Sequence, residues 1–411
     1  MSEYLTQHPM TQQSGPSFIV VGIPDVAKYE PSEDVRRLIR ETRVMSGAAR
    51  HHEAVRHLLD GMDVRWIAVE VPLADTFRQY AETNEPILVF ASGDPLFFGI
   101  ANTLRREFPE APLRVIPYFN SIQQLCHTIN LRYDDLTYVS LTGRPWHEFD
   151  AALINRICKI GVLTDRTHTP AAIARRMLDY GYTQYIMYVG TRLGHTEKGE
   201  VRRLTLEEAS IGQFDMPNCV VLEAIAPLTP KPFGIPDSDF ALLNGRQRMI
   251  TKAPIRLLTL RELNLSAATT LWDIGFCTGS ISIEARLQFP HVKVYSFEIR
   301  PEGKELMEVN SHRFGAPGIT AIINDFTTVD TTELPAPDAI FIGGYGGRLH
   351  EVMNKASLSL RTGGRMVINA VSDESRERFV ATAIDLGLKI INSMTVTVDS
   401  YHPITIITAQ K

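Results

Sequence analysis

Three acidic residues stand where successive strands in the second half of the chain are expected to end. Asp273 belongs to the run DIGFCTGS, Glu298 closes VKVYSFE, and Asp325 closes ITAIIND. After the first acid, Gly275 permits a tight turn and Gly279 lets the next helix approach closely. Backbone N–H groups at such a turn can hold a nucleotide-like cofactor. The second acid can accept from both ribose hydroxyls and the third from an adenine amino group. The pattern predicts an adenosine-binding site.

The glycine spacing favours one class of adenosine cofactor. A dinucleotide site needs G-x-G-x-x-G after the strand, but counted from Gly275 the second and third glycine positions hold Cys277 and Ser280. A cofactor without a diphosphate needs less exposed backbone, so the pattern favours S-adenosyl-L-methionine and leaves a nicotinamide oxidoreductase as a weak alternative. The predicted cofactor-binding residues of this half are Asp273, Gly275, Thr278, Gly279, Glu298 and Asp325.

The elements that must position these acids are short apolar strands. In the second half the expected strands are Thr270–Gly275, Val292–Glu298, Ile319–Asp325, Asp338–Gly344, Gly364–Ala370, Leu388–Val396 and Ile404–Ala409. Helices are expected between the first five, which gives a parallel sheet covered on both faces. Only a short connection around the run SYHP, residues 400–403, separates the last two strands, so an antiparallel pair is expected at one edge. Ligands bind beyond the carboxyl ends of such a sheet, where the acids lie.

The first half also alternates strands with helices. Expected strands are Phe18–Ile23, Pro86–Pro95, Leu113–Pro117, Lys159–Thr164 and Gln184–Gly190, with helices around Val35–Ile39, from about Ser121, and over Pro170–Tyr180. The second of these strands ends in the turn Gly93-Asp94-Pro95. A turn of this kind presents backbone groups to a ligand, and Asp94 can cap it or contact the ligand.

Length and proline content divide the chain into two domains. The 411 residues are enough for two or three domains. Four prolines fall within PLTPKPFGIP, residues 227–236, where no helix or central strand can run. We expect a first domain over residues 1–226, a stiff linker over 227–236, and a second domain over 237–411.

Composition excludes several classes of protein. An apolar content of 44% and a charged content of 22% are ordinary for a globular protein, and rule out a disordered, fibrous or coiled-coil chain. The formal net charge of −5 gives no basic footprint, so no nucleic-acid partner is expected. The four cysteines are scattered without a C-x-x-C pair, which predicts neither a disulfide framework nor a metal site. With no signal peptide and no apolar run long enough for a bilayer, we expect a cytoplasmic protein without a membrane partner.

Both halves resemble known families. TLWDIGFCTGSISIEA, Glu298, NDF and PDAIFIGGYGG are similar to class I S-adenosylmethionine methyltransferases. DSDF, MITKAPIRLLTL and FIGGYGG resemble, more narrowly, the decarboxylating precorrin methyltransferases of cobalamin biosynthesis. In the first half ASGDPLFFGIA, VSLTGRP and VLTDRTHTPAAIA resemble the tetrapyrrole methylases. The order of the domains matches the fused two-domain enzyme of that pathway.

The resemblance implies a fold and an activity. The fold is a tetrapyrrole methylase domain of two α/β subdomains, followed by a Rossmann-like methyltransferase domain with a seven-stranded sheet. The activity is methylation of a precorrin-6 type macrocycle at carbons 5 and 15, with decarboxylation of the ring C acetate to a precorrin-8 type product. It is compatible with a metal-free or a cobalt-containing macrocycle, and it implies a homo-oligomer. In the first domain it implies cofactor contacts at Gly93, Asp94 and Ser121.

The substrate carries many carboxylates, so basic residues and open backbone are its expected contacts. Gly343 and Gly344, with Gly346 and Gly347, could let a macrocycle lie flat over backbone. The basic candidates are Arg144, Arg248, Lys252, Arg256 and Arg348. His51, His52 and His147 could act as acids or bases, but surface histidines are the better interpretation, and no catalytic residue is assigned.

Three departures from the family patterns leave alternatives open. Pro24 stands at the second glycine position of VGIPDVAKYE, Tyr118 replaces a glycine in PYFNS, and Cys277 replaces a glycine of the C-terminal motif. The first two favour, as an alternative, a single-site methyltransferase whose first domain binds tetrapyrrole without catalysis. A methyltransferase acting on another small molecule or on RNA is a further alternative.

Overall fold

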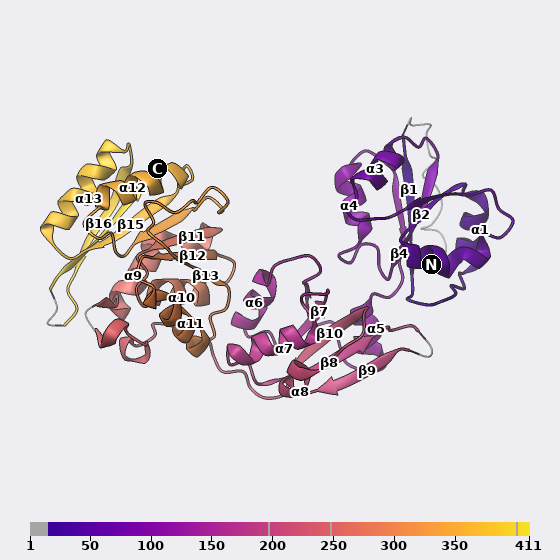
Figure 1. Cartoon of the computed structure of the whole chain (residues 1–411), viewed down its shortest axis with the longest axis horizontal. Helices are drawn as coiled ribbons and strands as arrows, with labels where there is room; N and C mark the ends of the chain where they lie inside the picture. The colour runs from indigo at the N-terminus through magenta and orange to yellow at the C-terminus, as the bar shows by residue number, and fades with distance from the viewer. Residues whose placement is uncertain (1–14, 196–197, 247–248, 400–401) are drawn as a thin grey trace.

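The computed structural model describes residues 15–195, 198–246, 249–399 and 402–411. These residues build three separate β-sheets, which Figure 1 shows as three bodies in chain order, from indigo through magenta to orange and yellow. The expected α/β class is confirmed. Two α/β subdomains make up the first half and a seven-stranded sheet with its helices makes up the second.

The first subdomain is a parallel five-stranded sheet with the order β3-β2-β4-β1-β5. Its central strands are buried on both faces because helices lie on either side, as the consecutive apolar residues of FIVVGI predict. Strands β2 and β3, of four residues each, were not expected. The elements are β1 Ser17–Ile23, α1 Glu33–Glu41, β2 Val44–Gly47, α2 Ala49–Val55, β3 Arg65–Ala68, α3 Ala74–Ala81, β4 Pro86–Ser92, α4 Ile100–Glu107 and β5 Leu113–Ile116.

The second subdomain is a mixed five-stranded sheet with the order β6-β7-β10-β8-β9. Strand β10 runs antiparallel to both of its neighbours, and it was not expected. Helix α5 begins where Asn120 and Gln123 form a reciprocal capping box, and α7 begins at Pro170 after the capping hydroxyl of Thr169. The elements are α5 Ser121–Thr128, β6 Thr137–Ser140, α6 His147–Ile154, β7 Lys159–Leu163, α7 Pro170–Asp179, β8 Tyr185–Thr191, β9 Glu200–Leu204, α8 Leu206–Ile211 and β10 Asn218–Ala224.

The C-terminal sheet has all seven expected strands, in the order β13-β12-β11-β14-β15-β17-β16. The first five are parallel, and β16 and β17 form the expected antiparallel pair at the edge. The elements are α9 Ala253–Leu263, β11 Thr270–Ile274, α10 Ser280–Gln288, β12 Lys293–Glu298, α11 Glu302–Phe314, β13 Ile319–Ile323, β14 Ala339–Ile342, α12 Leu349–Ser359, β15 Arg365–Ala370, α13 Asp373–Asp385, β16 Lys389–Val396 and β17 Ile404–Gln410.

The expectation of a helix in every connection between the first five strands was wrong in one place. Residues 324–338, all of them described, run from β13 to β14 without a helix. Asp325 and Asp330 instead accept bonds from the backbone and side chain of the threonine two residues on, which forms local turns. Pro335 and Pro337 then exclude a helix from the rest of the segment.

Buried charges join the second subdomain to the C-terminal domain. Arg176 on α7 donates two hydrogen bonds to the carboxylate of Asp150 on α6, at 2.6 and 2.7 Å. On the other side, Arg286 of α10 brings Nη2 to 4.0 Å from the same carboxylate and donates through Nε to the carbonyl of Pro317. The side chains of Asp150 and Arg286 are 1% and 0% exposed, so this ion cluster lies inside the contact between the two parts.

Direct contacts surround this cluster. The hydroxyl of Tyr182 donates to the carbonyl of Gly315 at 2.8 Å, and Nε2 of His147 lies 3.1 Å from the carbonyl of His291. Ile154 of α6 is fully buried in an apolar cluster whose other buried members are Ile235 of the linker and residues of the C-terminal domain. The second subdomain and the C-terminal domain therefore share one buried interface, although a proline-rich segment separates them in sequence.

The expected linker carries no regular secondary structure between Ile225 and Pro236, all of whose residues are described. Short 3-10 turns follow it at Asp237–Asp239 and Leu243–Gly245, and another precedes β11 at Leu265–Ala267. Among the described residues, no helix is long and apolar enough to cross a membrane.

Candidate functional site

A cavity of about 330 Å³ opens at the carboxyl ends of β11, β12 and β14 and beside the segment that follows β13. This is the place where an open α/β sheet binds its ligand. Of the predicted cofactor residues, Gly275, Glu298 and Asp325 line the cavity, together with the substrate candidates Gly344 and Arg348. Apolar walls come from Ile274, Phe297, Ile299 and Phe326.

Glu298 is a buried carboxylate at the end of β12. Both of its oxygens accept bonds from the Arg300 guanidinium at 2.8 Å, and Oε2 also accepts from the backbone N–H of Cys277 at 2.9 Å. Burial acts to raise the pKa of Glu298, but the bonds from Arg300 and the backbone outweigh it and hold that pKa below its usual value. The group is therefore an anionic acceptor.

Asp325, just beyond β13, is the more open acid. Its Oδ2 accepts from Arg348 at 2.6 Å, and Oδ1 accepts from the backbone and hydroxyl of Thr327. The Arg348 guanidinium, followed by the bonds from Thr327, lowers the pKa of Asp325 to about 2. The two pocket acids are thus both ionised at neutral pH and both paired with an arginine of this chain.

The floor of the cavity depends on two glycines. Gly275 has φ +76°, and a Cβ there would lie 2.4–2.6 Å from backbone atoms of Gly344. The turn after β11 and the turn after β14 therefore meet backbone to backbone. A side chain at position 275 would push them apart and fill the space where a ligand could lie.

Asp273, Thr278 and Gly279 do not line the cavity. Asp273 is buried beneath it, accepts from the hydroxyl of Ser282 at 2.5 Å, and has its pKa raised to about 7 by burial. Thr278 is also buried, and its carbonyl accepts from Asn310. Gly279 turns the chain into α10 with φ +76°, against the sulfur of Met307. These three residues shape the turn from below.

Cys277 shows why a glycine is usual at its position. Its φ of +53° lies in the left-handed region, which glycine adopts without cost. The side chain is buried, and burial raises the pKa of its thiol. A neutral, enclosed thiol packs as a small apolar group and is a poor nucleophile.

A second cavity, of about 430 Å³, lies between the two subdomains of the first half. The predicted cofactor residues Gly93, Asp94 and Ser121 all line it. Asp94 accepts from the backbone N–H of Leu96 at 2.9 Å, so it also closes its own turn. The second subdomain contributes residues from the loops after β6 and β7 and from the ends of β8 and β10, among them Thr142, Thr164, Asp165, Gly190 and Cys219.

Pro24 and Tyr118, the two residues of the first domain that replace glycines of the family pattern, lie in segments beside this second cavity. Gly22 is the penultimate residue of β1, where a Cβ would meet the carbonyl oxygen of Gly93 at 2.0 Å and the backbone nitrogen of Tyr118 at 2.7 Å. The one glycine kept from the expected pair is therefore the one that the close approach of three segments requires. Tyr118 is 38% exposed, and its ring packs against Phe119.

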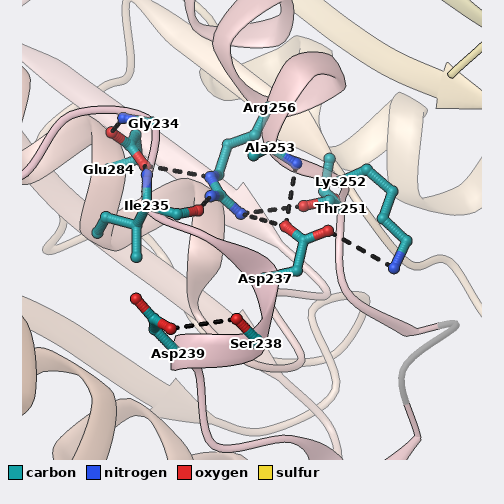
Figure 2. Close-up of polar contacts among 10 residues, drawn as sticks. All are labelled: Gly234, Ile235, Asp237, Ser238, Asp239, Thr251, Lys252, Ala253, Arg256 and Glu284. Atoms are coloured by element: carbon teal, nitrogen blue, oxygen red, sulfur yellow. Dashed lines mark hydrogen bonds and ion pairs between the residues drawn. The ribbon is translucent and has the colours of Figure 1, made fainter.

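The structure differs from the expectation for Arg256. Its side chain is fully buried, where its guanidinium donates to Glu284 at 3.2 Å, to the carbonyl of Thr251 at 3.0 Å, and to the carbonyl of Ile235, and lies 3.5 Å from Asp237 (Figure 2). A charge already enclosed by its own chain cannot clamp a substrate carboxylate. Arg256 instead holds the end of the linker against helices α9 and α10.

Lys252 belongs to the same cluster. Its ammonium lies 3.5 Å from Asp237, and its side chain is 17% exposed (Figure 2). Neither Lys252 nor Arg256 lines either cavity. Arg248 lies outside the described residues.

The remaining substrate candidates lie at or near the cavities. Gly344 and Arg348 line the C-terminal one, and Gly343 bonds through its backbone N–H to the carbonyl of Ile274 at that rim. Arg144 is exposed, and its guanidinium stacks on Phe98, which lines the N-terminal cavity. Of the histidines, His51 is buried with its pKa lowered to about 4 by burial, and His147 belongs to the interdomain contact.

Sequence reasoning missed two sets of cavity residues. In the C-terminal cavity Arg300 was missed, although its position two residues after the strand-end acid Glu298 could have indicated that it lies at the cavity. In the N-terminal cavity Arg50 and Asp165 were missed, although Asp165 stands in the quoted run VLTDRTHTP. Arg50 follows a strand of four residues that was itself not expected, so nothing in the sequence placed it there.

The residues of the C-terminal cavity fit an adenosine-containing donor. Glu298 supplies a buried anionic acceptor, Asp325 supplies a second acid, and the contact between Gly275 and Gly344 keeps the floor free of side chains. The apolar walls suit a purine ring.

Comparison with known proteins agrees with this geometry. The family model described as "Tetrapyrrole (Corrin/Porphyrin) Methylases" matches residues 19–210, and that described as "Precorrin methyltransferase domain" matches residues 244–408. The two matches define a chain that joins two kinds of methyltransferase domain.

Individual relatives narrow the assignment. The chain is 32% identical over 367 residues to a precorrin-6Y C(5,15)-methyltransferase (decarboxylating) from Sinorhizobium sp., covering 87% of this chain and 86% of the relative. A cobalt-precorrin-6B C(15)-methyltransferase (decarboxylating) from Salmonella typhi is 32% identical over 166 residues, 40% of this chain and 85% of that one. A crystal structure of precorrin-6y C5,15-methyltransferase from Geobacter metallireducens covers 44% of this chain and 97% of its own, with 32% identity and a TM-score of 0.41. The chain belongs to the family of precorrin-6Y C(5,15)-methyltransferases (decarboxylating).

Proposed function

We propose that this chain methylates a precorrin-6 type macrocycle at carbons 5 and 15 and decarboxylates the acetate of ring C, giving a precorrin-8 type product in cobalamin biosynthesis. The methyl donor is S-adenosyl-L-methionine. The proposal rests mainly on one observation. The chain belongs to this family, and each of its two halves contains a cavity lined by motif residues from the same half.

In the C-terminal domain the bound donor would supply an electrophilic methyl group on a sulfonium. The chain's own residues hold and orient it: Glu298 accepts from the ribose hydroxyls and Asp325 from the adenine amino group, over the open backbone at Gly275. Positioning of a methyl carbon against a nucleophilic ring carbon at near-attack distance can supply several kcal/mol of the barrier, so no further catalytic side chain is required.

The macrocycle is placed over the glycines after β14. Gly343 and Gly344 are both exposed and present backbone without side chains beside the donor cavity. Arginines at the rim can bind the carboxylates of the substrate. Enclosure of the ring C acetate would strip its water and favour loss of carbon dioxide into the conjugated ring.

We assign carbon 5 to the domain over residues 1–226, and carbon 15 with decarboxylation to the domain over residues 237–411. The similarity of the second half to a separate cobalt-precorrin-6B C(15)-methyltransferase (decarboxylating) supports this division. We also propose a homo-oligomer and a cytoplasmic location. The location is supported by the four unpaired cysteines, which fit a reducing compartment.

One observation favours a second candidate. Pro24 and Tyr118 occupy positions where the family pattern has glycines, and both flank the segments that meet at Gly22. If they obstruct the donor, the first domain binds tetrapyrrole without transferring a methyl group, and the chain has one donor site.

Titration calorimetry with S-adenosylhomocysteine tests both candidates on the full chain. Two binding sites, of which Glu298→Gln removes one and Gly93→Val the other, support two methyl transfers. One site, lost in Glu298→Gln, supports the second candidate. The absence of any binding would refute the methyltransferase function itself.

A further inference from the structure

The carboxylate proposed to hold the donor's ribose is already fully bonded within the chain. Oε1 of Glu298 accepts from the backbone N–H of Arg300 at 3.1 Å and from its Nε at 2.8 Å. Oε2 accepts from Nη2 of Arg300 at 2.8 Å and from the backbone N–H of Cys277 at 2.9 Å. Because a carboxylate offers about four acceptor positions, a ribose hydroxyl can bond Glu298 only by displacing one of these donors.

The guanidinium is the donor that can leave. The two backbone N–H groups are fixed by the turns at Cys277 and Arg300, and Glu298 itself is 2% exposed, so none of these can move far. The side chain of Arg300 is 35% exposed and ends in a group that water solvates well. It can rotate outward and keep its own charge solvated, while the ribose hydroxyls take over its hydrogen bonds to the buried Glu298 carboxylate.

We propose that Arg300 and the donor's ribose compete for Glu298, so that donor binding frees Arg300 at the rim of the cavity to bind a carboxylate of the macrocycle. This inference rests on the proposed function of the C-terminal cavity. Two hydroxyl donors replace two guanidinium donors on the same carboxylate. The released positive charge then stands at the rim of a cavity that Gly344 and Tyr345 also line, where the substrate is placed.

An ordered reaction follows from the exchange. Before the donor binds, Arg300 is neutralised by Glu298 and offers little to an acidic substrate. Afterwards it is an unpaired cation and can form a charge-assisted, bidentate contact. Arg300 is thus a positioning residue whose availability reports that the donor is in place.

The test is titration calorimetry of the full chain with S-adenosylhomocysteine. The variants are Arg300→Gln, which removes the guanidinium that competes for Glu298, and Arg300→Lys, which retains the positive charge but cannot donate two parallel hydrogen bonds to the carboxylate. Arg361→Gln is the matched control, because Arg361 pairs with Asp338 at 3.0 Å in the same domain with comparable exposure but lines neither cavity. Glu298→Gln and Asp325→Asn, each checked for folding by thermal unfolding, identify the C-terminal site.

We expect Arg300→Gln to bind S-adenosylhomocysteine about fivefold more tightly at that site, since a partly exposed ion pair no longer has to be broken. Arg300→Lys should fall between Arg300→Gln and the unchanged chain, and Arg361→Gln should match the unchanged chain. For the macrocycle, Arg300→Gln should raise KM about tenfold with kcat within about twofold. Unchanged or weaker binding of S-adenosylhomocysteine in Arg300→Gln would overturn the inference. If the unchanged chain has no site that the Glu298 and Asp325 variants weaken, the proposed function fails, and the inference falls with it.

Discussion

Replacement of Asp150 by alanine should loosen the contact between the second subdomain and the C-terminal domain. The substitution removes the carboxylate that faces both Arg176 and Arg286 and leaves two guanidinium groups without their shared counter-ion. Arg176 is 20% exposed and can turn toward water, whereas Arg286 is fully buried and cannot. The loss of stability therefore comes mainly from Arg286, whose buried charge is left without a counter-ion.

The size of the effect follows from that burial. Removal of one partner from a buried ion pair costs about 3–5 kcal/mol. Because one of the two arginines can recover its hydration, we expect the lower end, about 3 kcal/mol. With a urea dependence of about 3 kcal/mol per molar, the unfolding midpoint should fall by about 1 M.

The assay is urea unfolding of single-tryptophan versions that keep either Trp146, in the second subdomain, or Trp272, in the C-terminal core. In the unchanged chain both tryptophans should report one midpoint, and in Asp150→Ala the two midpoints should fall and separate. Asp134→Ala is the control, because Asp134 forms an exposed pair with Arg132, so its removal should change little.

A double replacement distinguishes loss of charge balance from loss of packing. Asp150→Leu with Arg286→Met removes both buried charges and should recover most of the stability lost in Asp150→Ala. Midpoints of Asp150→Ala within error of those of Asp134→Ala would refute the reasoning.

Three further results are expected. Gly344→Val should lower macrocycle turnover at least tenfold with S-adenosylhomocysteine affinity within about twofold, because a Cβ there makes only ordinary contacts, at 3.7 Å from Gly275, but covers the backbone over which the macrocycle is placed; unchanged turnover would contradict the placement. Gly275→Ala should lose about 1–3 kcal/mol of stability, measured by urea unfolding, because a left-handed alanine would clash with the backbone of Gly344; a stable variant would contradict that close approach. The raised pKa of Asp273, about 7, means that the folded chain binds the extra proton, so its contribution to stability is full below about pH 4 and is lost as the pH rises through 7. Asp273→Asn should flatten this dependence between pH 5 and pH 8, and parallel profiles for the two proteins would argue against it.

The sequence predicted the C-terminal sheet strand by strand because its strands are apolar runs between clear turns. In the first half, VMSG, RWIA and TYVS were missed because four residues are too few to show a clear period, although LRVI, equally short, was predicted from its apolar residues. EVRRL was missed because its charged residues hide the alternation. NCVVLEA is different, because its apolar run after Pro217 is a readable strand signal, and this strand could have been predicted from the sequence.

In the candidate site, too, only some of the residues could be placed correctly from the sequence. Motif residues at strand ends could be placed because the carboxyl ends of parallel strands meet at one edge. Arg256 could not, since its partners Glu284 and Asp237 lie 28 and 19 residues away with no periodic relation to it. A charge in a sequence does not show whether water or another residue will balance it, and the interdomain pairing of Asp150 with Arg286 was invisible for the same reason.

The buried contact between Asp150 and Arg286 should hold the two domains together after folding even if the peptide connection between them is cut. Ile225, just before the linker, is exposed, whereas the end of the linker at Gly234 and Ile235 is bonded to Glu284. A protease that cuts between Ile225 and Lys231 would therefore leave two fragments that remain together in solution. The fused gene and a pair of separate genes would then encode the same assembly, and fusion would secure equal numbers of the two partners.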